Sequence, residues 1–390
     1  MNVTYRIEKD ILYLAIAGRV DASNAAQAEE EIFNIKNDNS GKHTVIDADN
    51  LEYISSAGLR VILRLRKEDP DLAIINVSHD VYEVLDMTGF TDMVTVEKAY
   101  KRLSVEGCEF LAKGANGAVY RYDSETIVKT YFTRDSLPEI KQERENARRA
   151  FILGINTAIP YGIVRVGEGY GTVTELLNAV SVSKLIAKNE EDFSEALGYY
   201  VDMLKSIHAI TVEDGEVPDM RETALSWVDI VTPHIPEEQS KKLRALIEAV
   251  PKQNTLMHGD YHTNNVMVQN GEPLLIDMDT LCMGHPVFEL ASMFNALVGY
   301  SELDHQNMLN FFGYHFETAG RFWNAALKMY FGTDDEAFCQ EVMKKAMIVG
   351  YTRILRRAIL RPEDELSPVR IARCKEMLAQ LLGEVDTLIF

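Results

Sequence analysis

The residues with the clearest chemical potential form the sequence His-Gly-Asp-Tyr-His-Thr-Asn-Asn at 258–265. Two short apolar runs follow, separated by a Gln-Asn-Gly turn. This pattern predicts a β-hairpin in which a polar loop carrying Asp260 and Asn265 leads into the first strand and Asp277 ends the second. Two carboxylates and an amide would then meet at one end of the hairpin. Phosphoryl transfer uses such a set, because a carboxylate takes the alcohol proton while an amide and a carboxylate hold Mg²⁺ on the nucleotide.

The pattern His-Gly-Asp-x-x-x-x-Asn, with Ile-Asp at the end of the next strand, resembles the aminoglycoside phosphotransferase and choline kinase family, a branch of the protein-kinase-like fold. The resemblance implies that Asp260 is the catalytic base and that Asn265 and Asp277 are metal ligands. Asp279 would be a further ligand or a group behind the ligands. The alternative is an ordinary turn whose Asp and Asn side chains cap the backbone.

A glycine-containing segment lies between the first two strands expected after residue 107. Its candidate nucleotide contacts are Gly114, Asn116 and Gly117. Because a lysine, a helical glutamate, the base and the metal ligands follow it in that order, the segment would fold over the nucleotide phosphates. Two glycines three residues apart would also suit a plain hairpin turn.

A lysine and a glutamate follow that segment in the order used by kinase-like folds. Lys129 lies on the expected strand that would hold the α- and β-phosphates. The resemblance implies that a glutamate of the next helix pairs with this lysine; Glu145 matches best and Glu143 is the alternative. A later strand ends at Glu175, and the backbone from there to Leu177 would bind the nucleotide base. These residues do not distinguish ATP from GTP.

Residues 1–101 alternate short apolar strands with amphipathic helices, which predicts a compact α/β domain. Its sequences Gly-Arg-Val-Asp at 18–21 and Ile-Asp-Ala-Asp-Asn-Leu-Glu-Tyr-Ile-Ser-Ser-Ala-Gly-Leu-Arg at 46–60 resemble the anti-sigma-factor antagonist (STAS) family. The resemblance implies that Ser56 is a phosphoacceptor, although many members have Asp where this chain has Ser55. Because a serine at a helix N-terminus is also a good N-cap, Ser56 could serve either purpose or both.

The residues from 107 onward predict a second domain of two lobes. Hairpin strands up to about residue 176 form a small lobe, and residues 177–390 are helical apart from the catalytic hairpin. We therefore expect an α/β STAS-like domain (1–101) followed by a bilobal α+β kinase-like domain (107–390). Where the family reads Gly-Asp-Pro-x-x-Asp-Leu-Ala, this chain has His285 for the first Asp and Glu289 for the second.

The composition limits the partners and the location. A formal net charge of −20 argues against binding to nucleic acid, and no apolar run approaches membrane-spanning length. The four cysteines are scattered without a Cys-x-x-Cys pair, which fits a reducing cytoplasm and argues against structural zinc. We expect a cytoplasmic protein that binds neither nucleic acid nor membrane.

Together these patterns predict a phosphotransferase that moves the γ-phosphoryl of ATP or GTP to a hydroxyl of a small molecule, with Mg²⁺ as cofactor. The acidic surface would suit a cationic acceptor, although acidity also simply favours solubility. The sequence contains neither Asp-Phe-Gly nor Ala-Pro-Glu, which favours a small acceptor over a protein. Two alternatives stay open: a kinase domain that phosphorylates Ser56, or a nucleotide-sensing partner switch with little turnover. The STAS domain could bind a protein partner.

Overall fold

Two separate apolar cores organise the chain. This computed structural model describes residues 1–113, 117–133 and 137–390. The chain divides into the units Met1–Leu103 and Ser104–Phe390, and each core lies within one unit. Among the described residues, no helix combines the length and apolarity that crossing a membrane requires.

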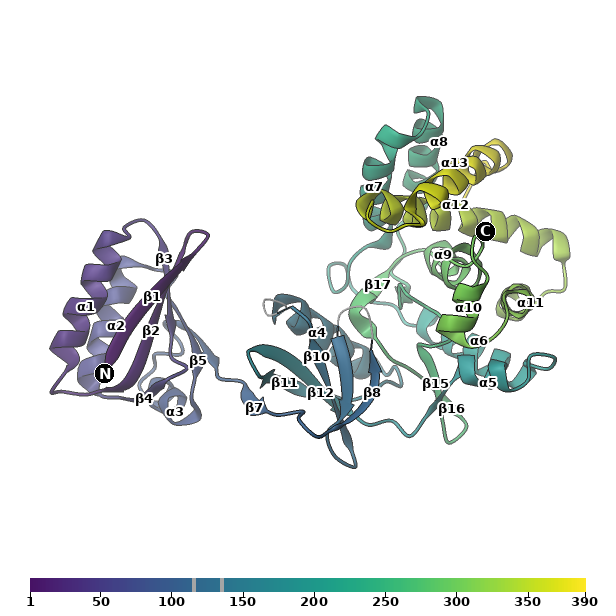
Figure 1. The fold of residues 1–390 in the computed structure, drawn as a ribbon. Helices are drawn as coiled ribbons and strands as arrows, with labels where there is room; N and C mark the ends of the chain where they lie inside the picture. Colours follow the sequence, from purple (N-terminus) through teal and green to yellow (C-terminus); the bar gives the residue numbers. More distant parts are fainter. Residues whose placement is uncertain (114–116, 134–136) are drawn as a thin grey trace. The chain divides into compact units, whose positions relative to one another are not determined.

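The first unit is a mostly parallel sheet with helices packed on it. Its strands follow the order β1-β2-β3-β5-β6, β4 pairs with β2, and only β1 is antiparallel to its neighbour. Alternate residues of β2 are buried, as expected for a strand with one face on a core. The strands are β1 (Asn2–Glu8), β2 (Ile11–Val20), β3 (His43–Asp47), β4 (Leu51–Ile54), β5 (Ala73–Val77) and β6 (Thr95–Lys98), followed by the short β7 (Lys101–Leu103). The helices are α1 (Ala25–Asp38), α2 (Ser56–Glu68) and α3 (His79–Met87), of which α1 and α2 lie side by side (Figure 1).

The N-cap of α2 is Ser55 and not Ser56. Ser55 has the extended backbone that a cap requires, and its Oγ accepts a hydrogen bond from the N–H of Gly58 at 3.5 Å. Ser56 is the first residue of the helix and its side chain is exposed. The capping role considered for Ser56 therefore belongs to Ser55. This residue follows directly after Ile54, the last residue of β4.

An antiparallel sheet and one long helix begin the second unit. Five of its strands lie in the order β11-β12-β10-β9-β8. They are β8 (Glu109–Lys113), β9 (Gly117–Arg121), β10 (Thr126–Tyr131), β11 (Pro160–Val166) and β12 (Gly169–Glu175). Helix α4 (Leu137–Ile152) connects β10 to β11 and packs on β11 and β12. The residues expected to bind nucleotide come from this sheet, α4 and the chain that follows.

The remainder of the second unit is helical around short strand pairs. The hairpin β15 (Val266–Gln269)–β16 (Glu272–Leu275) is extended by β13 (Val180–Ser181), and β14 (Leu256–Met257) pairs with β17 (Cys282–Met283). The helices are α5 (Val182–Lys188), α6 (Ser194–His208), α7 (Met220–Val231), α8 (Glu237–Glu248), α9 (Val287–Phe294), α10 (Gln306–Phe312), α11 (Phe316–Phe331), α12 (Glu336–Leu360) and α13 (Ser367–Glu384). A π-helical turn, Asn295–Gly299, continues α9.

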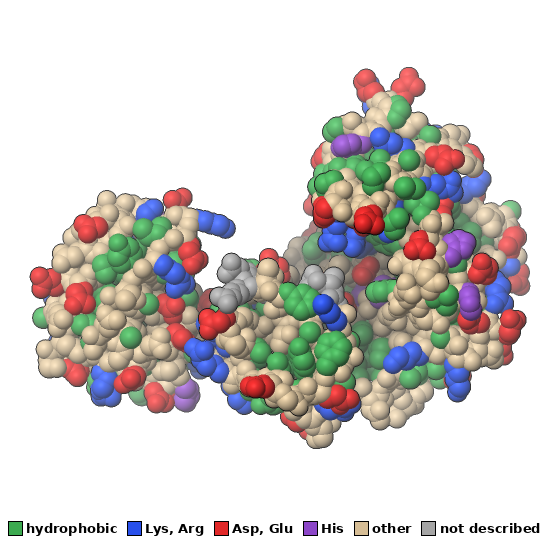
Figure 2. All heavy atoms as spheres, in the orientation of Figure 1, with side chains coloured by type: hydrophobic (Ala, Val, Ile, Leu, Met, Phe, Trp, Pro, Cys, Tyr) green, Lys and Arg blue, Asp and Glu red, His purple; other side chains and the backbone are tan. Residues whose placement is uncertain are grey.

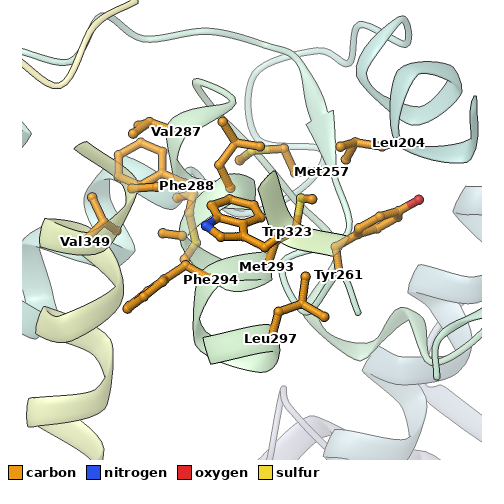
Figure 3. Close-up of a cluster of buried hydrophobic side chains, with 14 of the residues drawn as sticks. Leu204, Met257, Tyr261, Val287, Phe288, Met293, Phe294, Leu297, Trp323 and Val349 are labelled. Atoms are coloured by element: carbon orange, nitrogen blue, oxygen red, sulfur yellow. The ribbon is translucent and has the colours of Figure 1, made fainter. Parts of the chain in front are cut away.

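The largest core supports the loop between β14 and β15. Figure 3 shows apolar side chains from this loop, α9, α11 and α12 meeting in one cluster. Tyr261 is completely buried and exchanges hydrogen bonds with Tyr200 of α6: each hydroxyl donates to the other residue's backbone oxygen, at 2.6 and 3.3 Å. Helix α12 approaches α9 closely at Gly350, where a Cβ would lie 2.5 Å from the ring of Phe294. The loop is therefore held on a tightly packed base.

Candidate functional site

The structure brings Asp260, Asn265 and Asp277 to one end of the hairpin. The side-chain amide of Asn265 donates to the backbone oxygen of Asp260 at 3.0 Å, and the backbone oxygen of Asn265 accepts from the N–H of Ile276 at 3.0 Å. Asn265 is buried, whereas the carboxylates of Asp260 and Asp277 are 44% and 47% exposed. The two acids are thus open to a ligand while the amide between them is fixed.

The carboxylate of Glu289 braces the loop that carries Asp260. It is fully buried and accepts hydrogen bonds from the N–H groups of His258 and Gly259, at 2.6 and 3.0 Å. The Nε2 atom of His258 lies 3.0 Å from the backbone oxygen of Ile276, which ties the loop to the far side of the hairpin. Gly259 has φ +80°, and a Cβ there would lie 2.3 Å from the backbone oxygen of Thr280. The His-Gly pair therefore shapes the loop.

His285 replaces an acid of the expected pattern and takes a structural place instead. It is buried against the ring of Phe390, with ring centroids 4.8 Å apart, and its Nδ1 accepts from the N–H of Val287 at 3.1 Å. Burial and neighbouring positive charge lower its pKa to about 4, so the ring is neutral near pH 7. The carboxylate that accepts from the N–H groups of His258 and Gly259 is that of Glu289.

Lys129 pairs with Glu143, and this corrects the expected pairing with Glu145. The Lys129 ammonium lies 2.7 Å from Glu143, whose other oxygen accepts from the hydroxyl of Tyr131 at 2.8 Å. Glu145 instead pairs with Arg148 at 2.8 Å. Two residues along a helix rotate a side chain by roughly 200°, so only one of the two glutamates can face the sheet.

The ammonium of Lys129 also lies 4.0 Å from the carboxylate of Asp277. Burial alone would lower the pKa of Lys129, but the carboxylates of Glu143 and Asp277 outweigh it and raise that pKa. The lysine is therefore positively charged and lies between α4 and the end of the β15–β16 hairpin. This joins the small-lobe residues to the acids of the large lobe.

The acids at the hairpin end fit a magnesium ion. Asp277 adopts the left-handed region (φ 65°, ψ 65°), which few residues other than glycine do and which recurs at functional sites. Burial, and after it the charges of Asp277 and Glu143, raise the pKa of Asp279 to about 7, so a further negative charge is unfavourable at this position. Among the described residues, no three His, Cys, Asp or Glu side chains group closely enough to hold a metal alone. Asn265, Asp277 and phosphate oxygens would suit Mg²⁺, which keeps few protein ligands.

The structure describes only part of the glycine-containing segment that was predicted to contact the nucleotide. Gly114 and Asn116 lie outside the described residues. Gly117 begins β9, and a Cβ there would lie 2.1 Å from the backbone oxygen of Thr130, so close strand pairing already requires glycine at this position.

The segment after β12 keeps one backbone donor available. The N–H of Glu175 donates to Ile159 at 3.0 Å and that of Leu176 donates to Glu125 at 2.7 Å. Within the described part of the chain, no residue accepts a hydrogen bond from the N–H of Leu177. Of the two residues predicted to bind the nucleotide base, Leu177 therefore has the free donor.

Arg353 of α12 is a site residue that the sequence did not reveal. Its Nη1 donates to the backbone oxygen of Gly259 at 2.9 Å, and its Nη2 lies 3.6 Å from the carboxylate of Asp260. Its guanidinium also lies over the ring of Trp227, 5.7 Å from the centroid. Ninety-three residues separate Arg353 from Asp260, so no local spacing could have linked them.

Both units resemble known proteins. The model of the phosphotransferase enzyme family (APH) matches residues 107–322, and that of the STAS domain matches residues 2–105. Over 100 residues, the chain is 34% identical to the anti-sigma factor antagonist BtrV of Bordetella bronchiseptica, which covers 25% of this chain and 85% of that protein.

The chain is also similar to solved structures over much of its length. A thermostable mutant of aminoglycoside phosphotransferase APH(4)-Ia, in its apo form, is 13% identical with a TM-score of 0.50, over 70% of this chain and 94% of its own. A choline/ethanolamine kinase family protein from Mesorhizobium loti is 14% identical with a TM-score of 0.48, over 72% of this chain and 92% of its own.

These comparisons confirm the predicted fold class, an α/β STAS-like domain followed by a kinase-like domain. The phosphotransferase match spans more than half of the chain. The match between the first unit and BtrV covers most of the length of BtrV. The chain therefore belongs to the phosphotransferase enzyme family, and its phosphotransferase domain follows a STAS domain.

Proposed function

We propose that this protein transfers the γ-phosphoryl group of ATP or GTP to a hydroxyl of a small molecule, with Asp260 as the general base. The observation that carries the proposal is the meeting of exposed Asp260 and Asp277 carboxylates beside the fixed amide of Asn265. The acceptor oxygen bonds to the γ-phosphorus while the bond from that phosphorus to the β–γ bridging oxygen breaks. The acceptor proton passes to Asp260, and the nucleoside diphosphate leaves with the bonding electrons.

The residues around Asp260 would bind the metal ion and the phosphates and would position the base. Asn265 and Asp277 would hold Mg²⁺, which supplies positive charge to the phosphates. Lys129 would contact the α- and β-phosphates and is oriented by Glu143, which takes the role expected of Glu145. Arg353 positions Asp260 through the backbone of Gly259.

The nucleotide base would bind at the backbone of Leu177, whose N–H is available. We also propose that residues 114–117 cover the phosphates of the nucleotide. We further propose that the chain divides into a domain of residues 1–101 and a domain of residues 107–390. The STAS domain would give the phosphotransferase a surface for a protein partner.

A second candidate function follows from the position of Ser56. Because Ser55 caps α2, the hydroxyl of Ser56 is exposed at the first turn of the helix, where free N–H groups would stabilise a phosphate. A phosphotransferase domain on the same chain could then act on Ser56 of this or another copy. We rank this second because the chain has no Asp-Phe-Gly or Ala-Pro-Glu sequence of the protein-kinase activation segment.

One experiment separates the two candidates. The purified full-length protein is incubated with Mg-ATP or Mg-GTP and a panel of aminoglycosides, choline-like alcohols, sugars and sugar derivatives. Mass spectrometry then follows both the small molecules and the protein, with Asp260→Asn as the control. We expect phosphate on a small molecule and an unmodified Ser56. Stoichiometric phosphate at Ser56 that disappears in Asp260→Asn would reverse the ranking.

A further inference from the structure

A cavity of about 340 Å³ lies beside Asp260 and is lined by the catalytic loop, α9 with its π-helical turn, α10, α12 and the segment before α13. We call it the acceptor cavity. Its volume is in the range of about 300–1,000 Å³ that is typical of small-molecule sites. Because Asp260 is part of its wall, a molecule bound there can present a hydroxyl to the proposed base.

A second cavity, of about 830 Å³, lies against α4 and α7. It includes Asp279 and Arg353 in its wall but neither Asp260 nor Asp277. A hydroxyl bound in it would not meet the proposed base. The smaller acceptor cavity is therefore the one that the chemistry can use.

The charge in the acceptor cavity is opposite to that of the whole chain. Acidic side chains are scattered over the face of the molecule in Figure 2, and the formal net charge is −20. The acceptor cavity nevertheless has three arginines in its wall against two carboxylates. Arg370 pairs with Asp364 at 2.7 Å, and Arg353 lies 3.6 Å from Asp260. The third arginine is Arg357.

Arg357 is an exposed arginine of this cavity, and its positive charge contributes to the lowered pKa of Asp364 in the same wall. It lies one helical turn after Arg353 on the same side of α12. Its guanidinium is 5.5 Å from the ring centroid of Tyr300, which also lines the cavity. Among the described residues, no carboxylate lies within ion-pair distance of it. An exposed arginine held at a ring is suited to bind a phosphate or carboxylate group.

Three buried polar side chains in the same wall lack partners. The Nδ1 atom of His262, the hydroxyl of Ser292 and the amide of Asn295 make no hydrogen bond to any described residue. Each of these residues is at least nine-tenths buried. These atoms are closed off from solvent, and the Oδ1 atom of Asn295 faces Gly350 of α12, so they are not open to a ligand. Asn295 also begins the π-helical turn, a feature frequent at functional sites.

We propose that the phosphoryl acceptor is a small anion that carries a hydroxyl. This hydroxyl lies at Asp260 and receives the phosphoryl group, and its proton passes to that carboxylate. A phosphate or carboxylate group that takes no part in the reaction binds Arg357. This inference rests on the proposed function and replaces the cationic acceptor suggested by the net charge.

The test uses four probes that share a six-carbon skeleton: glucose 6-phosphate, gluconate, glucose and glucosamine. Binding of each to the full-length protein is measured by calorimetry with a non-hydrolysable Mg-nucleotide, and phosphoryl transfer is measured with Mg-ATP and Mg-GTP. We expect at least one anion to bind about tenfold or more tightly than glucose, and glucosamine to bind more weakly than glucose. The two anions distinguish a phosphate site from a carboxylate site.

Variants of Arg357 test whether this residue is the cause of the preference for an anion. Arg357→Gln should weaken binding of the preferred anion by about 10- to 100-fold, the effect of losing one hydrogen bond to a charged group, and should leave glucose binding unchanged. Arg357→Lys should restore part of the loss. The matched control is Arg361→Gln, which removes an exposed arginine just after α12 that does not line the cavity.

The outcomes separate this inference from the proposed function. Equal binding of all four probes, a preference for glucosamine, no binding of either anion at millimolar concentration, or an unchanged anion affinity in Arg357→Gln would each overturn the anionic acceptor. Phosphoryl transfer to glucosamine or glucose would leave the proposed function standing. Failure of the wild-type protein to bind Mg-ATP or Mg-GTP would overturn both.

Discussion

The ammonium of Lys129 lies 2.7 Å from the carboxylate of Glu143 and only 4.0 Å from that of Asp277. The lysine therefore has one partner that orients it and one that lies where the metal is proposed to bind. This arrangement links the small lobe to the end of the β15–β16 hairpin.

The first prediction concerns that pair. Lys129→Ala and Glu143→Ala should each raise the KM for nucleotide, and the double variant should cost less than their sum because they remove one interaction. We expect a coupling energy of about 0.5–3 kcal/mol from the double-mutant cycle in kcat/KM. Glu145→Ala is the matched control, since its partner is Arg148. Strict additivity of Lys129 and Glu143, or coupling of Lys129 to Glu145, would contradict the pairing.

The second prediction concerns the brace under the catalytic loop. Glu289→Ala leaves the buried N–H groups of His258 and Gly259 without acceptors, at about 1–3 kcal/mol for each. We expect a lower unfolding temperature for the second unit by calorimetry and a lower kcat, because the loop carries Asp260. Glu289→Gln keeps one oxygen and should lose less. An unchanged unfolding temperature in Glu289→Ala would show that the brace is unimportant.

The third prediction concerns the first unit alone. Its apolar core is formed by residues that end at Val94, so residues 1–101 should fold without the rest of the chain. Circular dichroism of this fragment should show an α/β spectrum and cooperative unfolding by urea. A fragment that is unfolded under native conditions would mean that its core needs the second unit.

A fourth prediction follows from a buried ion pair in that unit. Burial would raise the pKa of Asp69, but hydrogen bonds from Thr44 and the ammonium of Lys36, 3.3 Å away, outweigh it and lower that pKa. A lowered folded-state pKa contributes stability above the unfolded value of about 3.9, and this contribution is lost as pH falls through the folded value. The free energy of unfolding of the fragment should therefore fall with pH below about 4.

Asp69→Asn is the control for this pH dependence. It removes the titrating group, so its free energy of unfolding should change less across the same acid range. If the variant and the wild-type fragment lose stability in parallel below about pH 4, the acid sensitivity lies in other carboxylates.

The sequence predicted the parts of the site that local pattern controls. The loop of Asp260 and Asn265 and the strand that ends before Asp277 are specified by a few neighbouring residues, and the structure brings the three together. The choice between Glu143 and Glu145 depends on the rotation of α4 against the sheet. That rotation is a tertiary property, and both glutamates fit the motif.

The residues that sequence reasoning missed act over long distances along the chain. Arg353 reaches the catalytic loop because α12 packs closely on α9 at Gly350. The positive character of the acceptor cavity was hidden for a related reason. Net charge averages over the whole surface, whereas Arg357 acts only on what lies beside it.

The most direct measurement compares Asp260→Asn with Asp277→Asn for both phosphoryl transfer and binding of Mg-nucleotide. The account predicts that Asp260→Asn lowers kcat by about 10²–10⁴-fold, the usual contribution of a general base, with nearly unchanged nucleotide affinity. It predicts that Asp277→Asn weakens both, because the metal it would hold bridges the phosphates. Equal and small effects of the two substitutions would contradict the assignment of this site as a phosphotransferase centre.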